Sequence, residues 1–469
     1  MERLSGMDAS FLYMETPSSH MHVTGVIVVD PSTATGEYGY DRVVHLLASR
    51  LHLMPQFRRR VMAVPFGIDH PVWIEDPDFD IQNHVHRTTL RPPGSRHELA
   101  DLVGDIASRP LDRARPLWEM WVAEGGEDGT VALVSKMHHC AIDGVTGADL
   151  MSSLFDLEPE APDPDPPEEE WVPEKVPTDT QLSTDALVGR AMDPAKNVRA
   201  AFRTARTLAG AVGSFVNRTS DGPSPALPFT APATPWTKSI SPHRVVAFGQ
   251  AELDDLKAIK VAYDCKINDV VLAACTQALR EYLQGHGGVP DKPLISMVPV
   301  SVHGQGDETG GTNQVSSMAV RLPVNLESPV DQVLEIREDT KAAKEMQNAI
   351  GADMLRDFTQ FVPPALFNRA MRLYSRTGLA DRHRPIQNLV ISNVPGPPIP
   401  LYTAGARVVA VYPFGPLIEG AGMNITVLSN MGNMDMGVIA DPELVPDVWD
   451  IAQGFGTAVK ELKKHADSV

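Results

Sequence analysis

Hydrophobic positions divide the first half of the chain into short strands and amphipathic helices. Residues 20–30 are predicted to form a strand with Val23, Ile27 and Val29 on one face. Residues 41–53 have the spacing of an amphipathic helix, with Asp41 as its expected N-cap. A second helix is predicted to end before a proline. This second helix spans residues 96–108. The remaining strands of this half are predicted over 72–75, 117–123 and 130–137.

The second half repeats this mixture of strand and helix patterns. Strands are predicted over 244–248, 294–302, 314–322, 389–392, 407–412, 423–429 and 434–439. Helices are predicted over 253–261, 267–283, 330–346, 364–374 and 445–465. Both halves therefore have the composition of an α/β fold.

Two Pro-rich stretches separate the halves. Residues 156–177 are also acidic and cannot bury a core, so we expect an exposed linker there, and a second stretch runs from 223 to 242. A chain of 469 residues is too long for one ordinary core. We therefore predict an N-terminal domain over 1–185, a helical and Pro-rich connector over 186–243, and a C-terminal domain over 244–469.

The predicted helix at 186–217 is basic and amphipathic. Its arginines and lysine either face solvent while the helix packs on its own protein, or they contact an anionic lipid surface. The sequence leaves both interpretations open. The cationic residues are Arg190, Lys196, Arg199, Arg203 and Arg206.

Composition narrows the classes of function. The formal net charge of −19 disfavours a nucleic-acid partner. The sequence contains no run of eighteen or more apolar residues, so no transmembrane helix is predicted. The N-terminus does not resemble a signal peptide. We therefore expect a cytoplasmic protein whose membrane contacts are peripheral. Cys140, Cys265 and Cys275 have neither zinc nor disulfide spacing, which favours a reducing compartment. Cys140 is interpreted as a packing residue.

The densest chemistry lies in residues 137–144, which read Met-His-His-Cys-Ala-Ile-Asp-Gly. They follow a predicted buried strand and precede a predicted helix over 145–155, a junction at which catalytic groups are often held. The imidazole of His139 can accept a proton from an alcohol and later return it. Gly144 permits a tight turn or the close approach of a substrate.

Other interpretations of this segment remain. Neighbouring strand residues point to opposite faces, which disfavours His138 and His139 as ligands of one metal ion. A purely structural role for the pair is a further alternative, and Asp143 either orients His139 or pairs with an arginine to shape the loop. The chain has no Gly-x-Ser-x-Gly elbow, Gly-x-Gly-x-x-Gly turn or Gly-Lys-Ser phosphate loop. A base without a protein nucleophile suggests direct transfer to a substrate hydroxyl.

The pattern His-His-x-x-x-Asp-Gly resembles the signature of the acyl-CoA-dependent acyltransferase superfamily, which includes chloramphenicol acetyltransferase and the condensation domains of peptide synthetases. Within it, the chain resembles the bacterial wax ester synthase/diacylglycerol acyltransferase family almost end to end, and it lacks the Asp-Phe-Gly-Trp-Gly loop of the plant branch. The resemblance depends on ordered blocks, namely Leu4-Ser5…Asp8…Phe11-Leu12, residues 17–23, residues 110–119 with Pro116-Leu117-Trp118, Asn268-Asp269 and residues 392–397.

This resemblance implies roles for individual residues. His139 would deprotonate the acceptor hydroxyl, which then attacks the thioester of a fatty acyl-CoA. For His138, a part in the chemistry and structural support of the loop are equal alternatives. Asp143 would mainly keep the histidine loop in place, and Gly144 would leave room at the channel. Asn268 would donate to the developing oxyanion or the acyl group, although a helix N-cap is an equal alternative. Asp269 is expected to be structural.

The resemblance also implies a fold and an activity. The fold would be two chloramphenicol-acetyltransferase-like α/β domains with a channel between them, joined by the Pro-rich crossover. The enzyme would transfer a long-chain acyl group to diacylglycerol, a long-chain alcohol or both, with acyl-CoA as co-substrate and no cofactor or metal. It would contact a membrane or lipid-droplet surface peripherally. Two alternatives remain: a donor held on a carrier protein, and a catalytically weak lipid-binding protein of the droplet surface.

Overall fold

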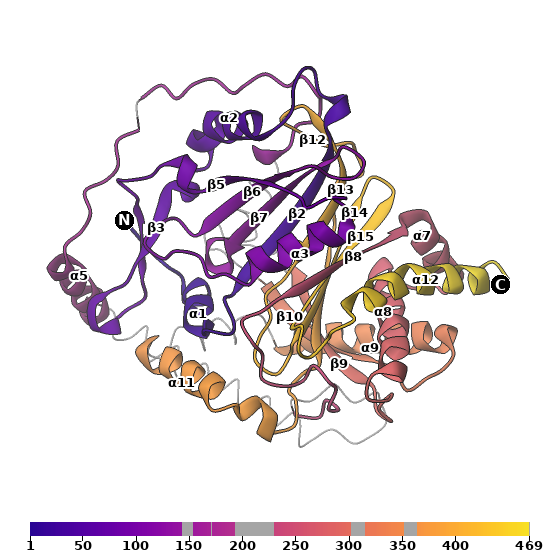
Figure 1. Ribbon diagram of the computed structural model, residues 1–469. Helices are drawn as coiled ribbons and strands as arrows, with labels where there is room; N and C mark the ends of the chain where they lie inside the picture. Colours follow the sequence, from indigo (N-terminus) through magenta and orange to yellow (C-terminus); the bar gives the residue numbers. More distant parts are fainter. Residues whose placement is uncertain (143–152, 170, 193–228, 302–314, 351–363, 469) are drawn as a thin grey trace.

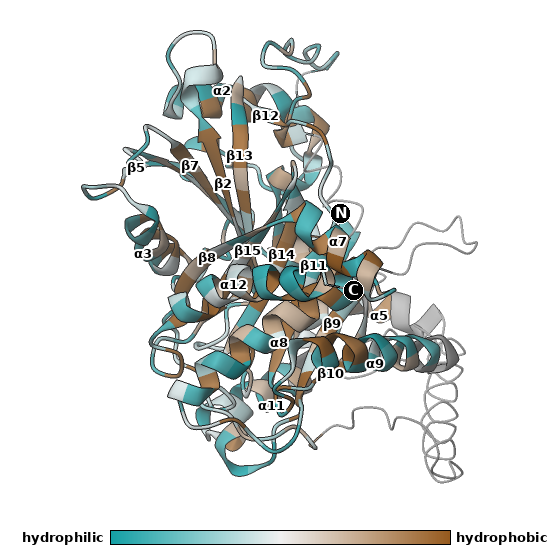
Figure 2. Cartoon of the chain, turned by 90° about the vertical axis from the view of Figure 1, so that its right-hand side faces the viewer, coloured by the Kyte–Doolittle hydropathy of each residue, from teal (hydrophilic) through white to brown (hydrophobic). Residues whose placement is uncertain are grey.

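A computed structural model describes residues 1–142, 153–169, 171–192, 229–301, 315–350 and 364–468 (Figure 1). Its described strands form two six-stranded sheets and one three-stranded sheet, with helices packed on them. The predicted α/β class is confirmed. Figure 2 shows hydrophobic residues along the strands of both large sheets and many hydrophilic residues on the outer helices.

The first large sheet has β7, the strand that ends at His138, in its interior. Its order is β12-β13-β2-β7-β6-β5, and β7 runs antiparallel to both of its neighbours. In this register His22 lies opposite His138. The strands are β2 (His22–Asp30), β5 (Val85–Thr89), β6 (Trp118–Glu124), β7 (Val131–His138), β12 (Tyr402–Thr403) and β13 (Ala406–Phe414).

Strand β13 joins this sheet from the far end of the chain. It pairs antiparallel with β2, so that Val411 lies opposite Ile27. The sheets are therefore not separated at residue 244, because one sheet takes strands from both halves. The division into 1–185, 186–243 and 244–469 stays a prediction, as do the Pro-rich crossover and the channel.

The second large sheet has the order β10-β9-β11-β14-β15-β8. Helix α8 is buried along most of its length, because it packs against α12 and α9 as well as the sheet. The strands are β8 (Val245–Glu252), β9 (Leu294–Ser301), β10 (Val315–Leu322), β11 (Leu389–Val394), β14 (Met423–Asn430) and β15 (Asn433–Ala440). The helices of this half are α7 (Leu253–Ala262), α8 (Ile267–Gly285), α9 (Pro329–Ile350), α11 (Pro364–Arg376) and α12 (Val448–Ala466).

The two large sheets meet where β13 passes β15. The buried carboxylate of Asp435 accepts hydrogen bonds from the Val411 N–H at 2.9 Å, Gln250 Nε2 at 2.7 Å and Asn430 Nδ2 at 3.2 Å. A Cβ at Gly437 would lie 2.2 Å from the carbonyl oxygen of Pro413. Glycine is therefore required there, and the crossing is both closely packed and hydrogen-bonded.

In the described residues of the N-terminal part the α-helices pack around the first sheet and the small sheet, and α3 lies between the first sheet and β8. These helices are α1 (Gly6–Met14), α2 (Tyr40–Arg50), α3 (Arg96–Ala107) and α5 (Asp179–Met192). The small sheet contains β1 (Glu2–Arg3), β3 (Arg59–Met62) and β4 (Val72–Glu75). Short 3-10 helices are η1 (Pro31–Thr33), η2 (Leu51–Leu53), η3 (Pro55–Arg58), η4 (Pro65–Gly67), η5 (Ile81–Asn83), η6 (His139–Ala141) and η7 (Leu379–Arg382).

The strands and helices predicted from hydrophobic periodicity are confirmed where the structure describes them, with ends shifted by a few residues. Asp41 as an N-cap is wrong, because α2 begins at Tyr40 and Gly39 precedes it. Most of the helix predicted over 145–155, and of the basic helix over 186–217, lies outside the described residues. Among the described helices, none is both long and apolar enough to cross a membrane.

Candidate active site

His138 and His139 lie where β7 gives way to η6. His138 is the last residue of the strand, and its Nδ1 accepts a hydrogen bond from the Cys140 N–H at 3.1 Å. Its side chain is nearly inaccessible, and Nε2 lies 3.6 Å from Glu15 Oε2. The imidazole of His138 therefore caps the turn that carries His139, which is a structural role.

The imidazole of His139 is held by two residues from the N-terminal segment. The backbone N–H of His139 donates to the carbonyl oxygen of Met21 at 2.9 Å, and Met21 has a left-handed φ of 52°. The Phe11 ring stacks on the imidazole, with centroids 3.9 Å apart and planes inclined by 17°. Its Nδ1 is buried and has no hydrogen-bond partner, although the residue as a whole remains partly exposed. The ring is thus oriented by contacts that leave Nδ1 unpaired.

Helix α1 is the element that brings Phe11 to this position. Ser5 caps it by accepting the Asp8 N–H at 3.1 Å, and the Ser5 hydroxyl donates to the Asp8 carboxylate at 2.6 Å. Leu12 and Cys140 pack in one apolar cluster on this helix. Cys140 is buried in this cluster, so its interpretation as a packing residue is confirmed, and the burial raises the pKa of its thiol.

Burial keeps the imidazoles of this region neutral. It lowers the pKa of His139 to about 4. It lowers the pKa of His138 to about 3, where Arg113 contributes further. The pKa of His22 is likewise held well below its ordinary value by burial. Near neutral pH, His139 is therefore in the form that accepts a proton.

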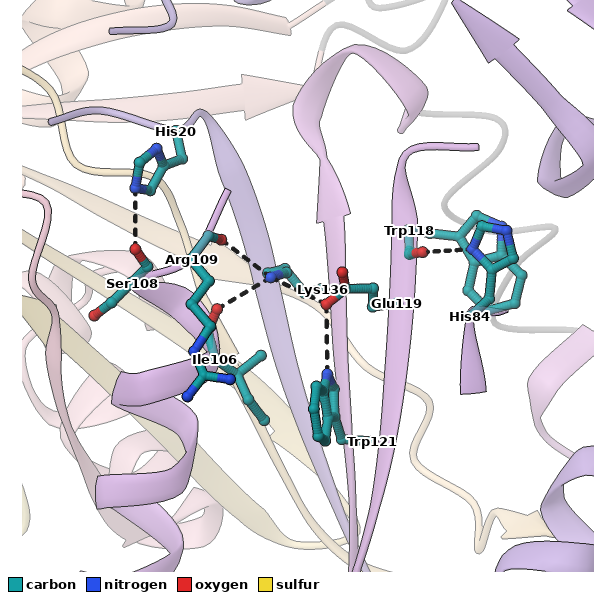
Figure 3. A network of polar contacts seen from close by, with 9 residues as sticks. All are labelled: His20, His84, Ile106, Ser108, Arg109, Trp118, Glu119, Trp121 and Lys136. Carbon is teal, nitrogen blue, oxygen red and sulfur yellow. Dashed lines mark hydrogen bonds and ion pairs between the residues drawn. The ribbon is translucent and has the colours of Figure 1, made fainter. Parts of the chain in front are cut away.

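A buried lysine ties the histidine strand to α3 (Figure 3). Lys136 Nζ donates to the carbonyl oxygens of Ile106 and Arg109, each at 3.1 Å, and pairs with Glu119 at 3.1 Å. At the same helix end, His20 Nε2 lies 3.1 Å from the carbonyl oxygen of Ser108. These polar contacts fix the position of β7 two residues before His138.

The Pro-Leu-Trp block borders the same strand end. Trp118 is buried, its Nε1 donates to the carbonyl oxygen of Phe57 at 2.8 Å, and its ring stacks on His84 at 4.6 Å (Figure 3). The His138 N–H donates to the carbonyl oxygen of Leu117 at 3.0 Å. The block therefore anchors β6 beside the histidines.

The other predicted site residues lie elsewhere or outside the described chain. Asp143 and Gly144 lie outside the described residues. Asp269 is structural, because its carboxylate accepts from the Lys266 N–H at 2.8 Å and from Thr340 Oγ1 at 2.8 Å.

Asn268 is the second residue of α8 and Lys266 occupies the N-cap, so the N-cap alternative for Asn268 is wrong. Asn393 Nδ2 lies 3.5 Å from Asn268 Oδ1, which brings two of the sequence blocks together. Among the described residues, no hydrogen bond or ion pair joins Asn268 or Asp269 to the histidines. Two open surface pockets of about 440 and 510 Å³, beside residues 230–239 and 380–385, contain none of these candidates.

Sequence patterns had not assigned roles to Phe11, Met21, Glu15 or Lys136. The helix carrying Phe11 had a usable signal, because a serine followed three residues later by an acid is typical of a helix N-terminus. The other three act through contacts with segments more than 25 residues away in sequence.

Solved structures with the same arrangement define the class of fold. The wax ester synthase/diacylglycerol acyltransferase from Marinobacter aquaeolei VT8 superposes with a TM-score of 0.71 at 24% identity, covering 100% of both chains. The first condensation domain of the CDA synthetase superposes with a TM-score of 0.55 at 15% identity, covering 100% of this chain and 98% of its own. The fold is that of two-sheet acyltransferases and condensation domains.

Sequence relatives narrow the class to a family. The model of the wax ester synthase/diacylglycerol acyltransferase catalytic domain matches residues 4–271, and that of the C-terminal domain matches residues 311–463. Two Mycobacterium tuberculosis proteins named as diacylglycerol O-acyltransferases are 41% and 35% identical, covering 100% and 99% of this chain and 91% and 97% of their own lengths. The chain belongs to the wax ester synthase/diacylglycerol acyltransferase family. It is therefore an acyltransferase, and the expected resemblance is confirmed.

Proposed function

We propose that this chain transfers a long-chain acyl group from acyl-CoA to the hydroxyl of diacylglycerol, a long-chain alcohol or both, with His139 as general base. The observation that carries the proposal is a neutral imidazole, clamped by Phe11 and Met21 at the end of β7, in a member of this family. Long acyl chains bury roughly 0.8 kcal/mol per methylene, so apolar contacts suffice to bind both substrates.

The proposed reaction is a direct transfer. His139 takes the hydroxyl proton of the acceptor while the oxygen attacks the thioester carbonyl, and a C–O bond forms as the C–S bond breaks. The coenzyme A thiolate leaves and receives the proton from the His139 imidazolium. The thioester supplies the activation, so the proposed reaction uses no cofactor and no metal.

Three further residues are proposed to assist. Asp143 would hold the histidine loop and Gly144 would leave space for substrate. Asn268 would donate to the developing oxyanion. Its Oδ1 faces the Asn393 amide at 3.5 Å, which leaves its own Nδ2 to donate.

The test of the base is His139→Ala with labelled palmitoyl-CoA and either dioleoylglycerol or hexadecanol. Ester formation should be lost. Cys140→Ala is the matched control, because its side chain is buried beside the base and has no role in the reaction. Retained activity in His139→Ala would remove His139 from the mechanism.

Donor and acceptor are tested on the unmodified protein. The proposal expects faster transfer from acyl-CoA than from an acyl-carrier protein, and the reverse order would favour the carrier-protein alternative. Diacylglycerol and fatty alcohol offered in competition, followed by lipid chromatography, identify the preferred acceptor. Lipid binding without transfer from either donor would favour the lipid-binding alternative.

We also propose that the protein works in the cytoplasm in peripheral contact with a membrane or lipid droplet. The support is chemical, because both proposed acceptors partition into lipid rather than water. Cosedimentation of the protein with lipid droplets, compared with a soluble marker enzyme, tests this location.

A further inference from the structure

Helix α11 presents a row of arginines to solvent. Arg369, Arg372 and Arg376 are all exposed and follow one another at spacings of three and four residues, which places them on one side of the helix. No acidic residue occurs within Pro364–Arg376. Within the described part of the chain, none of the three arginines forms an ion pair. We call this side the α11 arginine face.

The opposite side of α11 is fixed to the protein. Phe367 contacts the ring of Tyr13 edge-on at 6.3 Å, Tyr374 Oη lies 2.7 Å from His383 Nε2, and Ser375 Oγ donates to Glu419 at 2.5 Å. The arginine face is therefore held outward by contacts on the other side of the helix.

Exposed apolar side chains accompany the arginines. Leu373, between them, is 59% exposed, and Phe66 of η4, which packs against α11, is 93% exposed. Helix α5 also contacts η4 and exposes Leu187 and Val188, although it carries the acidic Asp185. Exposed aromatic and aliphatic residues beside cations are typical of surfaces that bind lipid bilayers.

From this arrangement we propose that the α11 arginine face docks the protein on a bilayer of anionic phospholipid, with Phe66 and Leu373 entering the interfacial layer. Charge complementarity selects this occupant, because a chain of net charge −19 is repelled by an anionic surface everywhere except at a local basic face. The proposal rests on the proposed function, since it names the surface that would face a lipid-borne acceptor.

The docking face lies one helix away from the candidate base. Helix α1 contacts α11 through Tyr13 and contacts His139 through Phe11. A bilayer bound at α11 would therefore lie on the side of the molecule from which α1 approaches the histidine loop.

The test is flotation of the full chain with vesicles of phosphatidylglycerol and phosphatidylcholine, against vesicles of phosphatidylcholine alone. Arg369→Gln/Arg376→Gln should weaken binding to the anionic vesicles roughly 25-fold, about fivefold for each arginine. Arg372 is kept, because its charge acts on Arg113 near the site. The matched control is Lys260→Gln/Lys464→Gln, which removes the same charge from exposed positions on α7 and α12.

Several outcomes would overturn the proposal: equal loss in the control, no loss in the arginine variant, or equal binding of the unmodified protein to both kinds of vesicle. Tighter binding to duplex DNA than to vesicles, lost in the same variant, would reassign the face to nucleic acid. Transfer to a water-soluble short-chain alcohol should be unchanged in the arginine variant. Absence of all transfer in the unmodified protein would refute the proposed function, while vesicle binding would still decide the docking face.

Discussion

His139 illustrates how a single side chain is prepared by its surroundings. Burial disfavours the imidazolium, and neighbouring His138 adds to that effect, so the pKa of His139 falls to about 4. The His139 imidazole is therefore neutral over a wider pH range than that of an exposed histidine.

This pKa predicts the acid side of the activity profile. A group with a lowered pKa stays neutral until the pH approaches that value, so kcat should remain flat from about pH 7.5 to about pH 5.5, whereas an ordinary histidine would lose half its activity near pH 6.5. Single-turnover rates across this range, with circular dichroism to confirm folding, are the measurement. A decline centred near pH 6.5 would contradict the assignment of this pKa to the base.

Phe11 provides a second prediction for a single residue. Phe11→Leu keeps bulk but removes a ring stack worth about 0.5–1.5 kcal/mol, so kcat should fall roughly two- to tenfold with a smaller change in KM. Water reaching the imidazole should also raise the pKa of His139 and move the acid limb to higher pH. Phe11→Tyr, which keeps the ring, is the control and should have the kcat and the acid limb of the unmodified protein. Unchanged kcat and pH profile in Phe11→Leu would show that the stack does not orient the base.

At this scale the sequence predicted the histidines but not their supports. The pattern at 138–144 is local and rich in chemistry, so His139 was readily singled out. The Met21 carbonyl and the Phe11 ring reach His139 from more than 100 residues away, and a backbone carbonyl leaves no trace in side-chain identity.

Strand β7 is the element on which the site depends. Its burial is nearly continuous along its length, and Lys136 is the buried cation within it. That lysine holds two carbonyl groups at the end of α3 and the carboxylate of Glu119. The strand is thus fixed to a helix on one side and to β6 on the other.

Removing the lysine should therefore weaken the fold. Lys136→Met leaves the two carbonyls and Glu119 without their cation, and the free energy of unfolding should fall by about 2–4 kcal/mol. Urea denaturation followed by circular dichroism is the measurement. Glu119→Gln keeps an acceptor for the ammonium group and should cost less. Equal stability of Lys136→Met and the unmodified protein would refute this role.

Elements with a clear apolar run or a regular spacing of apolar residues could be predicted from the sequence. Elements without such a pattern could not. The continuous apolar run at 131–134 indicated β7. Helix α1 buries Asp8 and Ser10 as well as Ala9 and Leu12, so it lacks the one-sided stripe by which helices are recognised. Edge strand β5 carries His86 and Arg87, which obscured its alternation.

The whole molecule is held together where β13 meets β15. Which strands pair across such a distance is decided by tertiary packing, so the local pattern at 407–412 predicted a strand but not the sheet it joins. At this crossing the Asp435 carboxylate accepts three hydrogen bonds, one of them from the Val411 N–H of β13.

Loss of that carboxylate should loosen the whole molecule. Asp435→Ala leaves three donors, including the Val411 N–H, without their acceptor, and the free energy of unfolding should fall by about 2–4 kcal/mol. Thermal and urea unfolding measure it. Asp254→Ala on the exposed surface is the control and should change little. A stable Asp435→Ala variant would show that packing alone holds the sheets together.

The position of β13 also has a consequence for biosynthesis. When β7 with its histidines has left the ribosome, β2 still has an open edge, and its partner is encoded more than 260 residues later. At ordinary translation rates this edge waits on the order of tens of seconds. The nascent chain therefore needs protection of that edge, by a chaperone or by temporary contacts of its own, before the histidine sheet is complete.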